Sequence, residues 1–179
     1  MGKITEDIKK SIKVIENFPI KGIQFQDIFS LTNNPKIFGR IVNEITKIIR
    51  KESITKIVGI EARGFIFGAA AAVKSNIPFV AIRKPGKLPG KTIKQSYKLE
   101  YGKDAIEIQH DAILKKDKIL LIDDLIATGG TAIASCKLLK KLNNKMITAF
   151  FVINLYNLKG TKKLFKENVK VVSLYETIG

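Results

Sequence analysis

The sequence has few of the features that mark disulfide-rich or membrane-spanning proteins. Its single cysteine, Cys136, excludes an intrachain disulfide, and no signal-peptide pattern stands at the start, so we expect a reducing cytoplasm. No apolar run reaches the roughly 18 residues that a membrane span needs, and the longest, around residues 149–153, has the length of a strand. A chain of 179 residues can bury about 70% of its unfolded surface. We therefore expect a single domain over residues 1–179 that folds without disulfide or metal.

Acidic residues are also scarce, with 16 Asp and Glu against 32 Lys and Arg, which gives a formal net charge of +16. Such a charge is typical of proteins that bind nucleic acid or another polyanion. The lysines, however, are dispersed along the chain and form no block with aromatic residues between them. This distribution favours general overuse of lysine at the surface and no specific nucleic-acid partner, because net charge constrains association and solubility but not fold.

Apolar segments of two kinds alternate along the chain. Runs typical of buried strands occupy residues 56–60, 79–82, 119–122, 146–153 and 169–174, and helical patterns occupy residues 65–73, 132–142 and 161–166. Continuously apolar strands that alternate with helices are the signature of a mostly parallel sheet covered by helices on both faces. The sequence therefore predicts an α/β fold.

Two segments interrupt this alternation. Residues 18–34 are irregular, and Asn34-Pro35 then provide the cap and the first residue of a helix. Residues 84–95 combine glycines, prolines and lysines, which predicts a mobile loop. The residues that follow, up to residue 109, alternate in the manner of a hairpin around Gly102-Lys103.

Segment 118–131 joins a buried strand to a glycine-bearing turn at the start of a helix. The turn consists of Ala127, Thr128, Gly129, Gly130 and Thr131. Free backbone N–H groups and the helix dipole favour an anion at this place. The glycines let the backbone close on a phosphate, and the threonines add hydroxyl donors. The turn lacks the lysine of a nucleoside-triphosphate P-loop and the spacing of the GxGxxG pattern.

Asp123 and Asp124, which precede this turn, are not explained by an ordinary connection between strand and helix. Two carboxylates beside an anion site repel each other and the anion, so they need donors. Sugar hydroxyls or a hydrated Mg²⁺ would supply them. The segment therefore predicts a sugar monophosphate, with its phosphate on the turn and its hydroxyls on the aspartates.

Basic residues follow two other predicted strands, at the carboxyl edge of the sheet where ligands bind in such folds. Arg63 follows the strand at residues 56–60, and Arg83 follows the strand at residues 79–82. A solvated basic residue is the plain alternative, but the planar guanidinium group binds phosphate oxygens in pairs. Together with Lys87, the two arginines predict a second, doubly charged phosphate group.

These motifs resemble those of a known family. Segment 118–131 is similar to the phosphoribosyl pyrophosphate (PRPP) motif of type I phosphoribosyltransferases, and residues 61–65, 83–90 and 97–102 are similar to the adenine phosphoribosyltransferases in particular. The resemblance runs in order from about residue 18 to about residue 174. It implies the type I phosphoribosyltransferase fold, with a small N-terminal hood at about residues 18–34 and a flexible loop and hairpin at about residues 84–109.

The resemblance implies transfer of the phosphoribosyl group of PRPP to adenine in purine salvage, giving AMP and pyrophosphate, by a homodimer that uses Mg²⁺. The implied PRPP and AMP contacts are Arg63, Arg83, Lys87, Tyr101, Asp123, Asp124, Ala127, Thr128, Gly129, Gly130 and Thr131. Adenine would lie against Gln24, Phe25 and Gln26, with Phe25 stacking on it; the family usually has arginine or lysine at the position of Gln26. Mg²⁺ would arrive with PRPP and reach the aspartates through water, without direct protein ligands.

Ala127 and Glu100 bear on the choice of base. In the 6-oxopurine enzymes the position of Ala127 is typically an aspartate that handles the purine N7 proton, which alanine cannot do. Glu100, with Tyr101 beside it on the mobile loop, is the replacement as the catalytic proton-transfer group, because a closed loop can raise a carboxyl pKa toward neutrality. Two alternatives stay open: a phosphoribosyltransferase for hypoxanthine, guanine or xanthine, and a non-catalytic PRPP-binding regulator.

Overall fold

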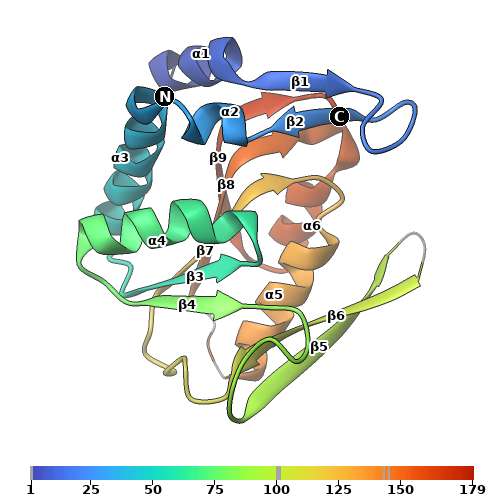
Figure 1. The fold of residues 1–179 in the computed structure, drawn as a ribbon. Coiled ribbons are helices and arrows are strands. Elements are labelled where there is room, and N and C mark those ends of the chain that lie inside the picture. Colours follow the sequence, from blue (N-terminus) through green and yellow to red (C-terminus); the bar gives the residue numbers. More distant parts are fainter. Residues whose placement is uncertain (1, 100–101, 143, 145) are drawn as a thin grey trace.

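The computed structural model, which describes residues 2–99, 102–142, 144 and 146–179, has a five-stranded parallel sheet at its centre (Figure 1). The order across the sheet is β4 (Phe79–Ile82), β3 (Lys56–Ile60), β7 (Ile119–Ile126), β8 (Ile147–Leu155) and β9 (Lys170–Thr177). Neighbouring strands pair in parallel throughout. Every residue of β8 is buried, and accordingly its sequence is mostly apolar and does not alternate. The predicted α/β fold is confirmed.

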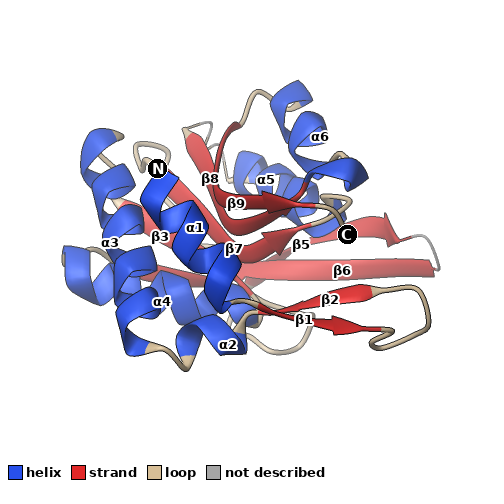
Figure 2. Cartoon of the chain, turned by 90° about the horizontal axis from the view of Figure 1, so that it is seen from above, coloured by secondary structure: helices blue, strands red, loops and turns tan. Residues whose placement is uncertain are grey.

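Helices cover both faces of the sheet (Figures 1 and 2). One face carries α1 (Gly2–Ser11), α2 (Phe29–Thr32), α3 (Pro35–Lys51) and α4 (Arg63–Ser75), and the other carries α5 (Gly130–Lys141) and α6 (Gly160–Lys166). A short 3-10 helix, η1 (Tyr156–Leu158), connects β8 to α6. None of the helices within the described residues is long and apolar enough to cross a membrane.

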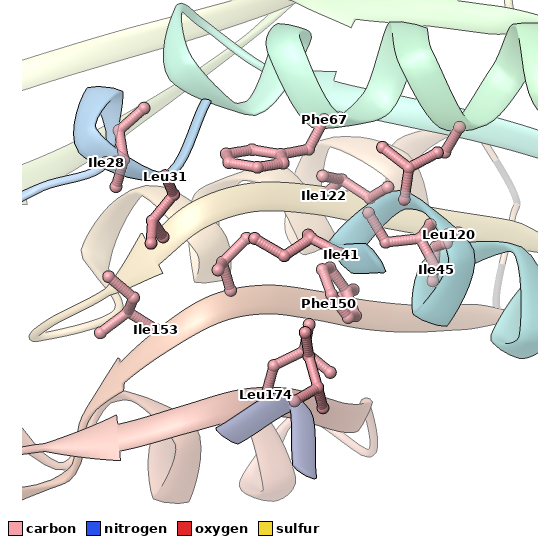
Figure 3. Close-up of a cluster of buried hydrophobic side chains, with 14 of the residues drawn as sticks. Ile28, Leu31, Ile41, Ile45, Phe67, Leu120, Ile122, Phe150, Ile153 and Leu174 are labelled. Carbon is pink, nitrogen blue, oxygen red and sulfur yellow. The ribbon is translucent and has the colours of Figure 1, made fainter. Parts of the chain in front are cut away.

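Two apolar clusters hold these layers together, because side chains alternate between the two faces of a strand. In β7, Leu120 and Ile122 belong to the cluster under α3 and α4. Ile119 and Leu121 belong to the cluster under α5. Figure 3 shows the first cluster, in which Phe150 of β8 is completely buried together with side chains from α3 and α4. Burial of each such side chain stabilises the fold by roughly 1.5–3 kcal/mol.

The start of α3 follows the sequence closely. The Asn34 side-chain oxygen accepts hydrogen bonds from the backbone N–H groups of Lys36 and Ile37, and Pro35 is the first helical residue. Upstream, the segment predicted as irregular contains β2 (Gln24–Asp27) and α2. β2 pairs with β1 (Lys13–Glu16), which lies outside the predicted hood. Both strands are short, β1 is exposed and β2 is largely half-buried, and neither has the apolar run that marks a buried strand.

The predicted hairpin is present but longer than expected. β5 (Thr92–Leu99) and β6 (Gly102–Gln109) pair antiparallel and extend from the sheet beside α5 (Figure 1). Residues 92–95 were expected in the loop but form strand, and Gly102 and Lys103 pair with Leu99 and Lys98, so the predicted turn at Gly102-Lys103 is wrong. Ile106 and Ile108 lie on one face of β6 and are buried, as is Glu107 between them, and a buried apolar face specifies the register of a strand pair.

Candidate functional site

A pocket of about 350 Å³ lies at the carboxyl ends of β3 and β7, where the hairpin faces the sheet. Its volume lies within the range of about 300–1,000 Å³ that small-molecule sites occupy. The residues that line it are Ile60, Glu61, Arg63, Lys84, Tyr97, Asp104, Ile106 and all of residues 123–132. The pocket therefore lies where an open parallel sheet binds its ligands.

Asp123 and Asp124 lie within β7, although the sequence predicted that the strand ends before them. Asp123 is still paired with Phe151 of β8, and the strand continues to Ile126. The Asp123 Oδ1 atom accepts a hydrogen bond from the Asp124 backbone N–H at 2.9 Å. Asp124 is 1% exposed, and its Oδ2 atom lies 3.0 Å from Nε of Arg63. The sheet thus fixes both carboxyl groups at the floor of the pocket.

The electrostatic environment of these carboxyl groups favours ligands that bring donors. Burial raises the pKa of Asp123 well above its usual range, and the charge of Asp124 raises it further. Burial also raises the pKa of Asp124, although the Arg63 guanidinium opposes this shift. Despite the short ion pair with Arg63, Asp124 Oδ2 accepts no hydrogen bond with good geometry from the described residues. Hydroxyl groups or a hydrated cation would satisfy these oxygens.

The turn after β7 is held by the beginning of α6. Gly129 has a φ angle of 80°, a left-handed conformation that suits glycine. The Gly160 N–H donates to the Ala127 carbonyl at 3.1 Å, and Lys163 Nζ donates to the Thr128 carbonyl at 2.9 Å. α5 begins directly at the turn, and the first N–H groups of a helix have no partner within it. The turn therefore presents donors and a helix dipole to the pocket, as an anion requires.

Replacement of Gly160 with alanine should distort this turn. An added Cβ atom would stand 2.3 Å from the Ala127 carbonyl oxygen and 2.9 Å from the Gly129 nitrogen, both of which are backbone atoms. We expect the free energy of unfolding to fall by about 1–3 kcal/mol, and the affinity for ribose 5-phosphate to fall with it.

Urea unfolding and calorimetry measure the two effects, and Gly39→Ala is the matched control. A Cβ atom at Gly39, inside α3, would meet no described atom within 4 Å. Alanine there should raise stability by about 0.5–1 kcal/mol. Unchanged stability and affinity in Gly160→Ala would show that the turn tolerates a side chain at its contact with α6.

Three pocket residues, Lys84, Tyr97 and Asp104, were not assigned to the site from the sequence. Lys84 Nζ forms an ion pair with the Asp104 carboxylate, and its hydrogen bond lowers the pKa of Asp104. The Tyr97 hydroxyl donates to Asp104 Oδ2 at 3.0 Å, and the Thr131 hydroxyl donates to the Tyr97 oxygen at 3.3 Å. Tyr97 and Asp104 are partners in the hairpin register. The correct hairpin register would have paired Tyr97 with Asp104, but the predicted turn at Gly102-Lys103 gave a different register.

The structure does not bring Arg83 and Lys87 into this pocket with Arg63, although all three lie within the described residues. Arg83 donates from Nε and NH2 to the Glu61 carboxylate at 3.2 and 3.0 Å, and from NH1 to the Lys87 carbonyl at 3.0 Å. The bond from Arg83 lowers the pKa of Glu61 below its usual range. Contact of Arg83 and Lys87 with a second phosphate group stays a prediction.

The predicted adenine contacts lie on β2, outside the residues that line the pocket. The Arg63 guanidinium carbon is 5.7 Å from the centre of the Phe25 ring, which lies within cation–π range and connects β2 to the aspartates. Gln24 is exposed, whereas Gln26 is 4% exposed and its amide oxygen has no partner among the described residues. Glu100 and Tyr101 lie outside the described residues.

Comparisons with known proteins agree with these features. A family model for the phosphoribosyl transferase domain matches residues 29–177. The adenine phosphoribosyltransferase of Actinobacillus succinogenes is 51% identical over 179 residues, which cover 100% of this chain and 99% of that protein. The solved adenine phosphoribosyltransferase of Thermoanaerobacter pseudethanolicus is 40% identical with a TM-score of 0.91, covering 97% of this chain and 99% of its own. The Saccharomyces cerevisiae enzyme, solved with adenine and an imino-altritol bisphosphate, is 36% identical with a TM-score of 0.91, covering 97% and 99%.

Proposed function

The chain belongs to the adenine phosphoribosyltransferase family, and from this premise we propose that it transfers the phosphoribosyl group of PRPP to adenine, giving AMP and pyrophosphate. It is a pentosyl transferase, and the role of such a reaction is purine salvage. The observation that carries the proposal is the pair Asp123 and Asp124, fixed on β7 in front of a turn built for an anion. That pair and that turn suit the hydroxyls and the phosphate of one sugar phosphate.

The 5′-phosphate would bind to the turn at residues 127–131, and the ribose hydroxyls would donate to Asp123 and Asp124. Support comes from the helix N-terminus at the turn and from the unsatisfied carboxylate oxygen of Asp124. Arg63 would meet the pyrophosphate, and its position in the pocket lining next to Asp124 supports this role. Arg83, Lys87 and Tyr101 complete the proposed PRPP contacts on the strength of the family resemblance.

Mg²⁺ fits this site as a partner of PRPP. Neighbouring carboxylates are oxygen donors of the kind that a hydrated Mg²⁺ takes. Among the described residues, no group of three or more His, Cys, Asp or Glu could hold a metal ion directly. Asp123 and Asp124 would contact it through water, and a bound Mg²⁺ would supply neutralisation of the pyrophosphate charge.

The reaction is a displacement at the anomeric carbon of the ribose. The bond from this carbon to the pyrophosphate oxygen breaks, the bond to adenine N9 forms, and the pyrophosphate leaves with the bonding electrons. The carbon has oxocarbenium character in between, so no protein nucleophile is needed. The chain contributes positioning of the sugar on β7 and the turn, charge complementarity through Arg63, and exclusion of water that would hydrolyse PRPP.

Adenine must lose a proton when N9 becomes bonded to the sugar, and we propose that Glu100 accepts it. Ala127 at the pocket offers no carboxylate for the purine, so another group has to serve. Phe25 would stack on the base, with Gln24 and Gln26 beside it. The Arg63 contact supports this arrangement, because it joins the Phe25 ring to the aspartate that holds the sugar.

Substrate competition tests the function. With PRPP and Mg²⁺, the protein is expected to convert adenine to AMP and to leave hypoxanthine, guanine and xanthine unchanged. Turnover of a 6-oxopurine without turnover of adenine would overturn the proposal in favour of that enzyme class. PRPP binding without any turnover, together with specific nucleic-acid binding at about 150 mM salt, would instead indicate a regulator.

A cytoplasmic homodimer completes the proposal. The cellular compartment rests on the single Cys136, which is buried, and the dimer rests on the family resemblance. Sedimentation of the full chain at micromolar concentration measures the assembly state. A monomer would contradict the proposed dimer and would leave the proposed activity unaffected.

A further inference from the structure

We propose that Tyr97 is a positioning residue whose hydroxyl competes with the sugar phosphate for the single hydroxyl proton of Thr131. In the free protein this contact joins the β5–β6 hairpin to the phosphate turn, and phosphate binding breaks it. The inference rests on the proposed function, because it takes the turn at residues 127–131 as the phosphate site.

The Asp104 carboxylate decides the direction of the two hydrogen bonds that connect Thr131, Tyr97 and Asp104. Lys84 pairs with the Asp104 carboxylate and lowers its pKa, so Asp104 is ionised at neutral pH and can only accept. Tyr97, 3.0 Å from Asp104 Oδ2, must therefore donate its one proton to Asp104. Burial raises the pKa of Tyr97, which keeps that proton on the phenol. The Tyr97 oxygen is left as an acceptor, and Thr131 donates to it at 3.3 Å.

A sugar phosphate changes this balance at Thr131. At neutral pH the phosphate carries about −1.5 to −2 charges and offers mainly acceptor oxygens. Thr131 has one hydroxyl proton, so it can donate to the phosphate or to Tyr97, but not to both. A hydrogen bond to a charged oxygen is stronger than a bond to a neutral phenol. The phosphate therefore takes the proton, and Tyr97 loses its contact with the turn.

This competition acts on the part of the chain that leads to the proposed proton-transfer group. Tyr97 and Asp104 face each other across the hairpin, and β5 ends at Leu99, immediately before Glu100 in the sequence. The backbone carbonyl of Lys94, earlier in β5, accepts a second contact from Lys141 of α5. Loss of the Thr131 contact leaves the far half of the hairpin without its bond to the turn. Phosphate binding thus removes the one hydrogen bond that joins Tyr97 to the turn among the described residues.

Tyr97→Phe is the test, because it keeps the ring and removes the competing oxygen, together with the hydrogen bond of that hydroxyl to Asp104. Net hydrogen bonds of this kind contribute about 0.5–1.5 kcal/mol, so ribose 5-phosphate should bind about two- to tenfold more tightly to the variant than to the wild type. In a Thr131→Ala background the same substitution should leave the affinity unchanged. Titration calorimetry on the full chain measures all four proteins, and Tyr156→Phe, at an exposed tyrosine, is the matched control.

Several outcomes would overturn the inference. Equal or weaker binding by Tyr97→Phe means that the hydroxyl does not compete, and weaker binding would make Tyr97 itself a phosphate ligand. A gain that persists in the Thr131→Ala background would not pass through Thr131. If the wild type binds neither ribose 5-phosphate nor PRPP, the proposed function fails together with the inference. If the wild type binds them and Tyr97→Phe does not bind more tightly, only the inference fails.

A second measurement needs no substitution at Tyr97. In wild-type protein with isotope-labelled tyrosine, ribose 5-phosphate should shift the NMR signal of the Tyr97 phenol carbon, because its oxygen loses an incoming hydrogen bond. The signal of Tyr156 should stay in place. An unmoved Tyr97 signal at saturating ligand would refute the competition even if Tyr97→Phe failed to fold.

Discussion

Replacement of Asp123 and Asp124 together by asparagine is expected to weaken PRPP binding by about 100-fold or more, while the single variant Asp123→Asn should be more stable than the wild type. Each carboxylate would lose charge-assisted hydrogen bonds worth about 1.5–3 kcal/mol, and the attraction for a hydrated Mg²⁺ would be lost with the charges. Calorimetry with PRPP and Mg²⁺ measures the affinity. Asp111→Asn, at an exposed aspartate, is the control for a change of one charge. An unchanged PRPP affinity would remove the aspartates from the sugar site.

The gain in stability follows from the pKa of Asp123. Burial raises this pKa in the folded protein above the value of an unfolded aspartate, so the folded state holds the proton more firmly. The stabilisation is complete below the unfolded pKa of about 3.9 and is lost as the pH rises through the folded pKa. At neutral pH the wild type has therefore lost part or all of this stabilisation, whereas asparagine at residue 123 does not titrate and loses none. Asparagine also keeps the oxygen that accepts the Asp124 N–H bond.

Thermal unfolding of the single variant Asp123→Asn checks this result. Its melting temperature should exceed that of the wild type at pH 7, and the difference should shrink as the pH falls through the raised pKa. A lower melting temperature at neutral pH would mean that Asp123 is stabilised by its surroundings. The site would then hold its carboxylate without a cost to the fold.

The parts of the fold that the sequence predicted well are those decided by local chemistry. Asn34 and Pro35 start α3 through contacts within three residues, and β3 and β4 begin and end where their apolar runs do. The predicted strand at residues 119–122 was shorter than β7. The prediction ended the strand where the aspartates end the apolar run, whereas pairing with β8 extends β7 to Ile126. Pairing between strands is a property of the sheet, which the local sequence does not contain.

The site shows the same division. The glycine turn and the aspartates are contiguous in the sequence, so their chemistry could be predicted from it. The partner of Arg83 is Glu61, 22 residues away, and the partner of Lys84 is Asp104, 20 residues away. Which carboxylate each cation meets depends on how the β4 loop and the hairpin fold over β3. The sequence therefore could not predict that the Arg83 guanidinium pairs with Glu61, and contact of Arg83 with a phosphate stays a prediction.

Glu100→Gln is expected to lower kcat for AMP synthesis by about 100- to 10,000-fold, the usual contribution of a general acid or base. Glutamine has the same shape but cannot take a proton from adenine. The dissociation constant of PRPP should change by less than about threefold, because Glu100 is not among the proposed PRPP contacts. Pre-steady-state quench and calorimetry measure the two quantities separately, and Glu6→Gln, at an exposed glutamate of α1, is the control.

The contrast between kcat and PRPP affinity decides the role of Glu100. Equal losses of both would indicate a residue that binds PRPP or closes the loop over it. A loss confined to kcat, together with loss of the acidic limb of the pH–rate profile, would identify the group that takes the proton. The position of this carboxylate matters because Ala127 provides none at the turn.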